Sequence, residues 1–205
     1  MAMAPTKEWT RNPKVIDLLD LDFENQTARF GGLDFEGLGL RGRARADISQ
    51  LLDAPVVSFA LETDPFAPRA TANAIGRPLP ATADPAALGS AELAVEGRFG
   101  PEGLELERIA GRLDETSLSG SLALPPPPAV ARLTLSLDVL DLDRYLPPGP
   151  AEPASPGEAL TSLLGTLAGF DLEAVIEVER ASVAGAVARG LRVVIEPQAD
   201  EAARP

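Results

Sequence analysis

Apolar and polar residues alternate along much of this chain. Leu133, Leu135, Leu137 and Val139 alternate with arginine, threonine, serine and aspartate. A period of two places successive side chains on opposite faces of a β-strand, so one face of this strand is apolar and the other polar. The pattern predicts a mainly β protein built from antiparallel strands. The other segments predicted as strands are Leu19–Phe23, Thr27–Phe30, Leu33–Asp47, Val56–Glu62, Ser90–Phe99, Leu104–Ile109, Leu113–Ser121, Phe170–Ala181 and Leu191–Glu196.

Glycine, asparagine and proline separate these strands. Gly37 lies inside the Leu33–Asp47 run, where a glycine indicates a bulge or a strong bend. The prolines Pro125–Pro128 cannot lie within a sheet and predict an exposed, extended connection. The segments predicted to turn the chain are Asn25-Gln26, Gly31-Gly32, Gly100–Gly103 and Val183–Gly185.

Two segments carry helix signals instead. Pro65–Ile75 has Asp64 as a candidate N-cap, a proline at its first position and Gly76 as a candidate C-cap. Glu158–Leu167 places its leucines on one face at helical spacing and follows a serine that suits an N-cap. Ile48–Asp53 is predicted to form a shorter helical turn.

These elements predict one domain. Residues 13–146 are predicted to form a β-meander, and residues 157–197 a helix and a β-hairpin of the same domain. The proline-rich residues 147–156 predict a linker between them. We expect residues 1–12 to be a disordered or non-native lead and residues 198–205 a disordered tail. The chain opens without the features of a signal peptide, and we expect it to be a piece of a longer protein.

Composition narrows the possible functions. The 205 residues include 31 acidic and 18 basic ones, a formal net charge of −13, and show no basic stripe of the kind that binds nucleic acids. The same charge disfavours binding to anionic membrane surfaces. Cysteine and histidine are absent, which removes thiolate chemistry, the commonest general base and the commonest metal ligand. We therefore expect no enzymatic activity, no metal and no cofactor.

Carboxylates form two candidate chemical groups. Asp138, Asp141 and Asp143 are a candidate metal-ligand set, but no calcium-type glycine turn or distal glutamate accompanies them. A solvated strand face and a helix cap explain them more simply. The glutamates within Glu173–Glu179 are a candidate acid–base group, but an exposed polar strand face explains them more simply.

Arginines and a tyrosine complete the candidate side chains. Arg41, Arg43 and Arg45 alternate on one strand, where they would either grip a phosphate or lipid headgroup or simply form an exposed strand face that guards a sheet edge. The second interpretation is the simpler one. Tyr145, the sole tyrosine, is predicted to be a core anchor at the end of a strand.

The segment from Gly111 to Pro147 resembles a known family. It reads G-R-L-D-x-T-x-L-x-G-x-L from Gly111 to Leu122, then L-x-L-x-L-D-x-L-D-L-D-R-Y-L-P from Leu133 to Pro147. This pattern is similar to that of the AsmA family, which are envelope proteins of bacteria with two membranes. A further family segment, F-D-P-R-x-L-L-x-x-L-G, is matched only in part at Asp64–Gly76.

The resemblance implies a fold, a location and a function. It implies an elongated, curved antiparallel sheet, either a β-groove or an open sandwich, with a few short helices. Such proteins extend through the periplasm from an N-terminal anchor helix in the inner membrane, and we expect that helix to be absent from this chain. The implied function is outer-membrane assembly and phospholipid transport between membranes. The implied partners are phospholipid acyl chains, the remaining segments of the full-length protein and outer-membrane assembly proteins.

The apolar strand faces are the candidate lipid-contacting sites. In the alternative interpretation the same faces form the core of a closed β-scaffold that binds another envelope protein. An open apolar trough would favour the lipid carrier, and a filled interior would favour the scaffold. The candidate lipid-contacting residues are Leu133, Leu135, Leu137, Val139, Leu172, Ala174, Ile176 and Val178.

Overall fold

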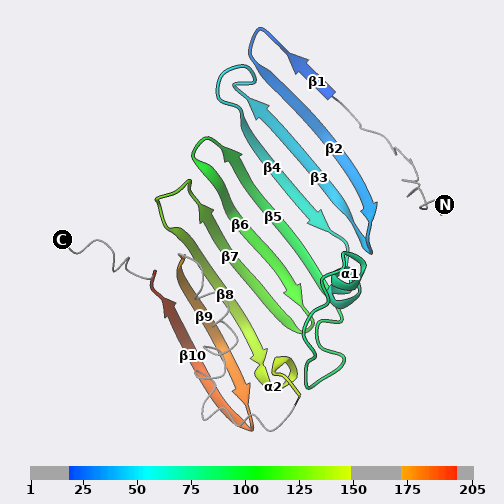
Figure 1. Cartoon of the computed structure of the whole chain (residues 1–205), viewed down its shortest axis with the longest axis vertical. Coiled ribbons are helices and arrows are strands. Elements are labelled where there is room, and N and C mark those ends of the chain that lie inside the picture. The colour runs from blue at the N-terminus through cyan, green and yellow to red at the C-terminus, as the bar shows by residue number, and fades with distance from the viewer. Residues whose placement is uncertain (1–18, 149–171, 198–205) are drawn as a thin grey trace, which may run out of the picture.

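One ten-stranded sheet makes up most of the molecule. The computed structural model describes residues 19–148 and 172–197. In this part of the chain ten strands form one sheet, in which they lie side by side in sequence order (Figure 1). The strands are β1 (Leu19–Asp22), β2 (Thr27–Gly37), β3 (Leu40–Ser49), β4 (Val56–Thr63), β5 (Ala91–Gly100), β6 (Gly103–Leu113), β7 (Thr116–Leu124), β8 (Ala131–Asp141), β9 (Leu172–Val183) and β10 (Ala186–Ile195).

The sheet is open. β1 and β10 are its two edges and do not pair with each other, so the strands form neither a barrel nor a second layer in the described part of the chain. All neighbouring strands are antiparallel except β8 and β9, which are parallel. The prediction of a mainly β protein with an open, curved sheet is therefore confirmed.

The strand register gathers the apolar residues on one face. Residues paired across neighbouring strands point to the same side of a sheet. One row of partners runs from Leu33 in β2 through Leu61, Val95 and Ile109 to Val193 in β10. The residues between these positions in each strand point the other way and are mostly charged or hydroxylated. The alternation in the sequence thus becomes one apolar face and one polar face.

The turn between β2 and β3 differs from the prediction. Gly31-Gly32 do not turn the chain but lie inside β2, where the register shifts between Phe30 and Leu33 as in a β-bulge. The chain turns instead at Leu38 and Gly39, which have φ values of 54° and 80°. Two successive residues with positive φ make the tight hairpin turn that fits strand twist. Leucine seldom adopts this conformation, which is why the sequence pattern did not indicate a turn here.

The first helix begins later than predicted. Helix α1 spans Pro68–Ala74 and has Ala67 rather than Asp64 at its N-cap. Phe66 pairs with Ala91 through two backbone hydrogen bonds of 2.8 and 2.7 Å, and this pairing keeps the preceding residues extended. Pro68 takes the first helical position, for which its fixed φ is suited. The helix ends one residue earlier than predicted, at Ala74 with Ile75 as its C-cap, and Gly76 follows with φ +76° and its N–H bonded to Asn73 O.

Two other helix predictions have different outcomes. Ile48–Asp53 is not a helical turn, because Ile48 lies in β3 between Ala28 and Val57 and the chain turns only after Ser49. The predicted helix Glu158–Leu167 lies outside the described residues, as do residues 1–12, 149–156 and 198–205. Pro125–Pro128 connect β7 to β8 as predicted, but they form a turn rather than an extended segment, since the N–H of Ala129 donates to the carbonyl oxygen of Pro126 at 3.2 Å.

The main cluster of buried apolar residues lies at β9. Helix α2 (Leu142–Tyr145) follows β8 directly, and Leu142 packs with Ile176, Val178, Ala181 and Val183 of β9. None of these five side chains is more than 1% exposed. Because Leu142 contacts the apolar side chains of β9, α2 lies on the apolar side of the sheet.

Candidate functional site

The apolar face is the first candidate site. It continues in register from β2 to β10, and strands about 4.8 Å apart make each row of side chains roughly 38 Å long. A bilayer has a hydrocarbon core of about 30 Å, so one row is longer than the acyl chains of a single leaflet. Two rows define the face: Phe30, Ala46, Phe59, Gly97, Leu106, Leu122, Leu133, Ala174 and Ile195, and Leu33, Ala44, Leu61, Val95, Ile109, Gly120, Leu135, Ile176 and Val193.

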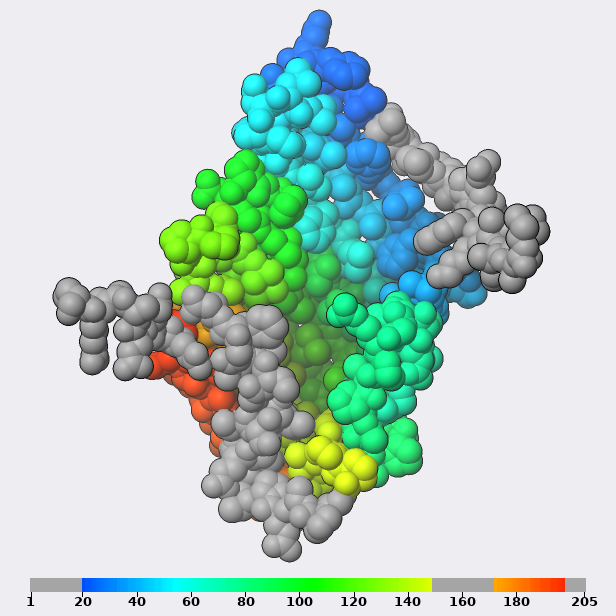
Figure 2. All heavy atoms as spheres, viewed as in Figure 1, coloured from blue at the N-terminus to red at the C-terminus, as the bar shows by residue number. Residues whose placement is uncertain are grey.

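The apolar face is only partly covered over its middle strands. Phe59, Leu61, Val95 and Ile109 are half-buried, and Phe99 is 57% exposed. Figure 2 shows the side on which α2 lies, with the surface hollowed over the middle strands next to the raised segment around α1. A packed core would bury such side chains almost completely. These strands therefore present aliphatic and aromatic groups at an accessible, concave surface.

Glycines on this face allow the sheet to curve. Gly97 and Gly120 point to the apolar side, where an added Cβ would meet the carbonyl oxygens of Glu105 and Thr134 on the neighbouring strands. Gly42 and Gly111 would meet neighbouring carbonyl oxygens in the same way. Only glycine permits so close an approach of two backbones.

The candidate lipid-contacting residues lie in three different environments. Leu133, Leu135 and Leu137 are half-buried on the apolar face. The β9 residues Leu172, Ala174, Ile176 and Val178 lie on the same face but are 0–7% exposed, so they are already packed. Val139 is 45% exposed and lies in register with the exposed Arg180. The accessible apolar residues of β2–β6 were not among the candidates, although their alternation is equally regular.

The opposite face carries ladders of cross-strand ion pairs. Arg43 lies 3.1 Å from Asp34, Arg41 lies 2.7 Å from Glu36, and Arg45 lies 3.6 Å from Glu96. All of these side chains are exposed, so each pair contributes little to stability. The arrangement fits the interpretation of the three arginines as an exposed strand face. It also fixes which side of the sheet can be apolar, because a one-residue slip would bury these charges.

A cluster of polar side chains closes one end of the sheet, and we name it the polar corner: Asp84, Asp114, Thr116, Asp143, Arg144 and Tyr145. At its centre, Asp114 accepts hydrogen bonds from the backbone N–H groups of Leu88, Gly89 and Ser90 at 2.8–3.1 Å. The hydroxyl of Tyr145 donates a fourth bond to Asp114 at 2.9 Å. The carboxylate of Asp114 lies in the β6–β7 turn and thus links this turn both to the segment that precedes β5 and to helix α2.

These contacts change the acidity of both partners. Burial opposes ionisation of Asp114, but its hydrogen bonds from Leu88, Ser90, Tyr145 and Gly89 hold the pKa of the carboxyl below its ordinary value. Burial and the bond to Asp114 raise the pKa of Tyr145 to about 12. The hydroxyl therefore stays protonated and serves as a donor, so Tyr145 is a polar anchor rather than only an apolar one.

The remaining residues of the polar corner each hold one neighbouring segment. Arg144 Nε donates to Asp84 at 2.8 Å, and Thr116 Oγ1 donates to the carbonyl oxygen of Val139 at 2.8 Å. Asp143 accepts from the N–H of Ala184 at 2.8 Å, which ties α2 to the β9–β10 turn. Asp114, Thr116, Arg144 and Tyr145 belong to the sequence pattern that resembles the AsmA family, so in this structure part of that pattern forms a structural clamp.

The aspartates considered as metal ligands bond to backbone groups instead. Asp138 accepts from the N–H of Ser117 at 2.8 Å and so links β8 to β7, while Asp141 caps α2 through the N–H of Asp143. No group of three acidic side chains arranged to hold a metal ion occurs among the described residues. Asp84 was missed from the sequence, although Asp84-Pro85 is a turn signal and its carboxylate accepts from the N–H of Ala86.

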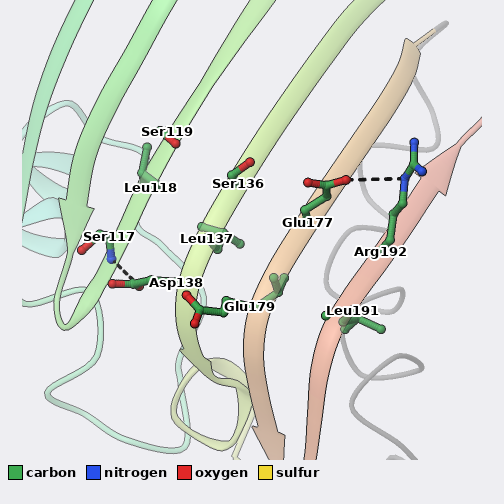
Figure 3. A pocket seen from close by; sticks show the side chains of 12 residues that line it. Ser117, Leu118, Ser119, Ser136, Leu137, Asp138, Glu177, Glu179, Leu191 and Arg192 are labelled. Carbon is green, nitrogen blue, oxygen red and sulfur yellow. Dashed lines mark hydrogen bonds and ion pairs between the residues drawn. The ribbon is translucent and has the colours of Figure 1, made fainter.

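A second hollow lies on the polar face. It has a volume of about 640 Å³ and lies over β7–β10, between the serines Ser119 and Ser136 and the ion pair Glu177–Arg192 (Figure 3). Glu177 is 3.7 Å from Arg192 and exposed, and Glu179 lies farther along the same strand. Among the residues that line this hollow, no general base lies next to a nucleophile. The hollow therefore has the features of an ordinary strand surface.

Comparison with known proteins gives no assignment. The chain matches no protein-family model, no curated protein and no solved structure. Neither helix in the described part of the chain is long and apolar enough to cross a membrane. The resemblance to the AsmA family therefore rests on the sequence pattern between Gly111 and Pro147.

Proposed function

We propose that this chain is a non-enzymatic, AsmA-like module of the bacterial periplasm that carries phospholipid acyl chains on its apolar sheet face. In this proposal it belongs to a protein anchored in the inner membrane and contributes to lipid transport and outer-membrane assembly. The observation that carries the proposal is the apolar face itself, which continues from β2 to β10 and is only half-buried over its middle strands. The sequence pattern of the polar corner supports the proposed likeness to the AsmA family, and the apolar face supports the proposed binding of acyl chains.

The energetics of such a face suit acyl chains. Each buried CH2 group contributes about 0.8 kcal/mol, so a chain that covers part of one row binds measurably without any polar contact. The headgroup would remain in water, because the face itself presents no charged side chain. Binding of this kind is selective for apolar chains and tolerant of the headgroup.

The most direct test is to look for bound lipid. We expect native mass spectrometry of the protein purified from bacteria to show co-purified phospholipid. Leu135→Asp should reduce the bound fraction because it places a charge on the half-buried apolar face, whereas Ser136→Asp on the polar face should not. Circular dichroism checks that both variants keep the β fold. Absence of lipid from the parent protein, or equal loss in both variants, would count against the proposal.

A protein-binding scaffold remains the second candidate, and one observation favours it. The edge strand β10 carries the exposed apolar residues Val187 and Val194 on the polar side of the sheet, at 59% and 53% exposure. An edge strand with apolar groups on both sides is suited to pairing with a further strand. Binding of an outer-membrane assembly protein that is lost in Val194→Lys, with no lipid in the parent protein, would favour this function.

A further inference from the structure

The two ends of the strands are built differently. At one end of the sheet, the strands are covered by three features, namely the polar corner, α1 and α2. The opposite end, which we name the turn end, consists of residues 23–26, 50–55, 100–103 and 125–130. Its first two turns adjoin each other, since the N–H of Leu51 donates to the carbonyl oxygen of Gln26 at 3.2 Å. Among residues 19–148 and 172–197, the apolar face therefore has one clamped end and one end bordered mainly by turns.

Large apolar side chains project at the turn end. Phe23 and Leu52 lie in the first two turns and are 70% and 71% exposed. Phe99, Leu21 and Leu124 are 57%, 47% and 40% exposed, and they belong to the last row of the apolar face before the turns. The apolar surface thus continues from the sheet face onto the tips of the turns.

The chemistry of the turn end favours a lipid surface over a protein partner. The turns contain Glu24, Asp53 and Glu102 but no lysine or arginine. Residues typical of protein interface hot spots, namely tryptophan, tyrosine and arginine, do not occur in them either. Separate apolar tips can each enter the boundary between headgroups and acyl chains without a complementary partner surface. Their negative charges exclude strongly anionic membranes.

We propose that the turn end docks the sheet on a zwitterionic lipid bilayer. Docking there would bring the accessible end of the apolar face against the membrane, so that an acyl chain passes from the bilayer onto the face without crossing water. This inference rests on the proposed lipid function and adds the place where the lipid enters. The clamped end, with its polar corner, faces away from the bilayer.

Binding to lipid vesicles tests the inference. We expect the parent protein to sediment with vesicles of phosphatidylcholine and phosphatidylethanolamine, and to bind less when a third of the lipid is anionic. The double variant Phe23→Asp with Leu52→Asp should bind at least about tenfold more weakly, because it removes both projecting side chains and adds charge. The matched control is Leu38→Asp with Ile75→Asp at the clamped end, where the side chains are similarly exposed at 59% and 52%. The control should bind like the parent.

The outcomes separate this inference from the proposed function. No vesicle binding by the parent, or equal loss in both double variants, overturns the docking inference even if phospholipid co-purifies. Self-association of the parent through Phe23 and Leu52, seen by analytical ultracentrifugation, overturns it in favour of a second copy. Vesicle binding that depends on the turn end, in a protein that retains no lipid, instead overturns the proposed lipid carriage.

Discussion

At the scale of single residues, the position of each side chain on the sheet decides what a substitution does. Ile176 is 1% exposed within the core cluster at β9, whereas its register partner Leu135 is half-buried on β8. We expect Ile176→Asp to cost roughly 3–5 kcal/mol, because it buries an unpaired charge. Leu135→Asp should cost clearly less, since its carboxylate can reach water. Urea unfolding of both variants measures the difference, and equal losses would mean that β8 is as closed as β9.

Gly120 offers a second test at this scale. Its position against the carbonyl oxygen of Thr134 leaves no room for a Cβ, so Gly120→Ala should destabilise the protein by about 1–3 kcal/mol. Gly32→Ala is the matched control, because nothing lies within 4 Å of the added atom. Thermal unfolding of the two variants gives the comparison. A neutral Gly120→Ala would show that the close approach of β7 and β8 is unimportant for curvature.

Tyr145 and Asp114 make stability depend on pH in opposite directions. The raised pKa of Tyr145 means that its contribution is complete below the ordinary tyrosine pKa of about 10 and is lost as the pH rises towards 12. The lowered pKa of Asp114 means that its contribution is complete above the ordinary value of about 3.9 and is lost as the pH falls below it.

Absorbance titration measures the first effect directly, since Tyr145 is the sole tyrosine. We expect a midpoint near 12 in the folded protein, and Asp114→Asn should lower it. A midpoint near 10, unchanged in the variant, would contradict the bond between Tyr145 and Asp114. Tyr145→Phe should cost about 1.5–3 kcal/mol, because it removes a hydrogen bond to a charged group.

At the scale of elements, alternation predicted the strands well because each strand has one apolar and one polar face. The phases of β5 and β9, and of β8 as far as Leu137, follow directly from it, but Val139 is exposed. Three features depended on long-range contacts or backbone conformations that a local alternation of apolar and polar residues does not reveal. Phe66 pairs with Ala91 and delays α1, Leu38 adopts a positive φ, and Asp114 binds backbone groups about 25 residues away. The parallel pairing of β8 and β9 was equally hidden, since alternation has no direction.

The link between α2 and the last hairpin can be tested as one element contact. Asp143 accepts the N–H of Ala184 in the β9–β10 turn. Asp143→Ala should expose that N–H and speed its hydrogen exchange at least several-fold, while Asp143→Asn retains an acceptor and should change it less. Exchange followed by nuclear magnetic resonance reports the amide of Ala184. Unchanged exchange in Asp143→Ala would mean that the hairpin is held elsewhere.

At the scale of the whole molecule, the open sheet separates two surfaces of opposite character. The sequence predicted both surfaces, but it placed the lipid contacts on β8 and β9. The structure shows that the apolar residues of β9 are packed, whereas those of the middle strands β4–β6 are only half-buried. The central claim is therefore that lipid meets the apolar face of the middle strands and not the polar face.

Site-specific quenching tests this claim most directly. The chain has no cysteine, so single cysteines can carry a fluorophore at chosen positions. Leu61→Cys and Val95→Cys report the apolar face, and their neighbours Ala60→Cys and Ala94→Cys report the polar face. With a phospholipid that carries a quencher on its acyl chain, we expect strong quenching at Leu61 and Val95 and little at Ala60 and Ala94. Equal quenching at all four positions, or none at any, would contradict the account.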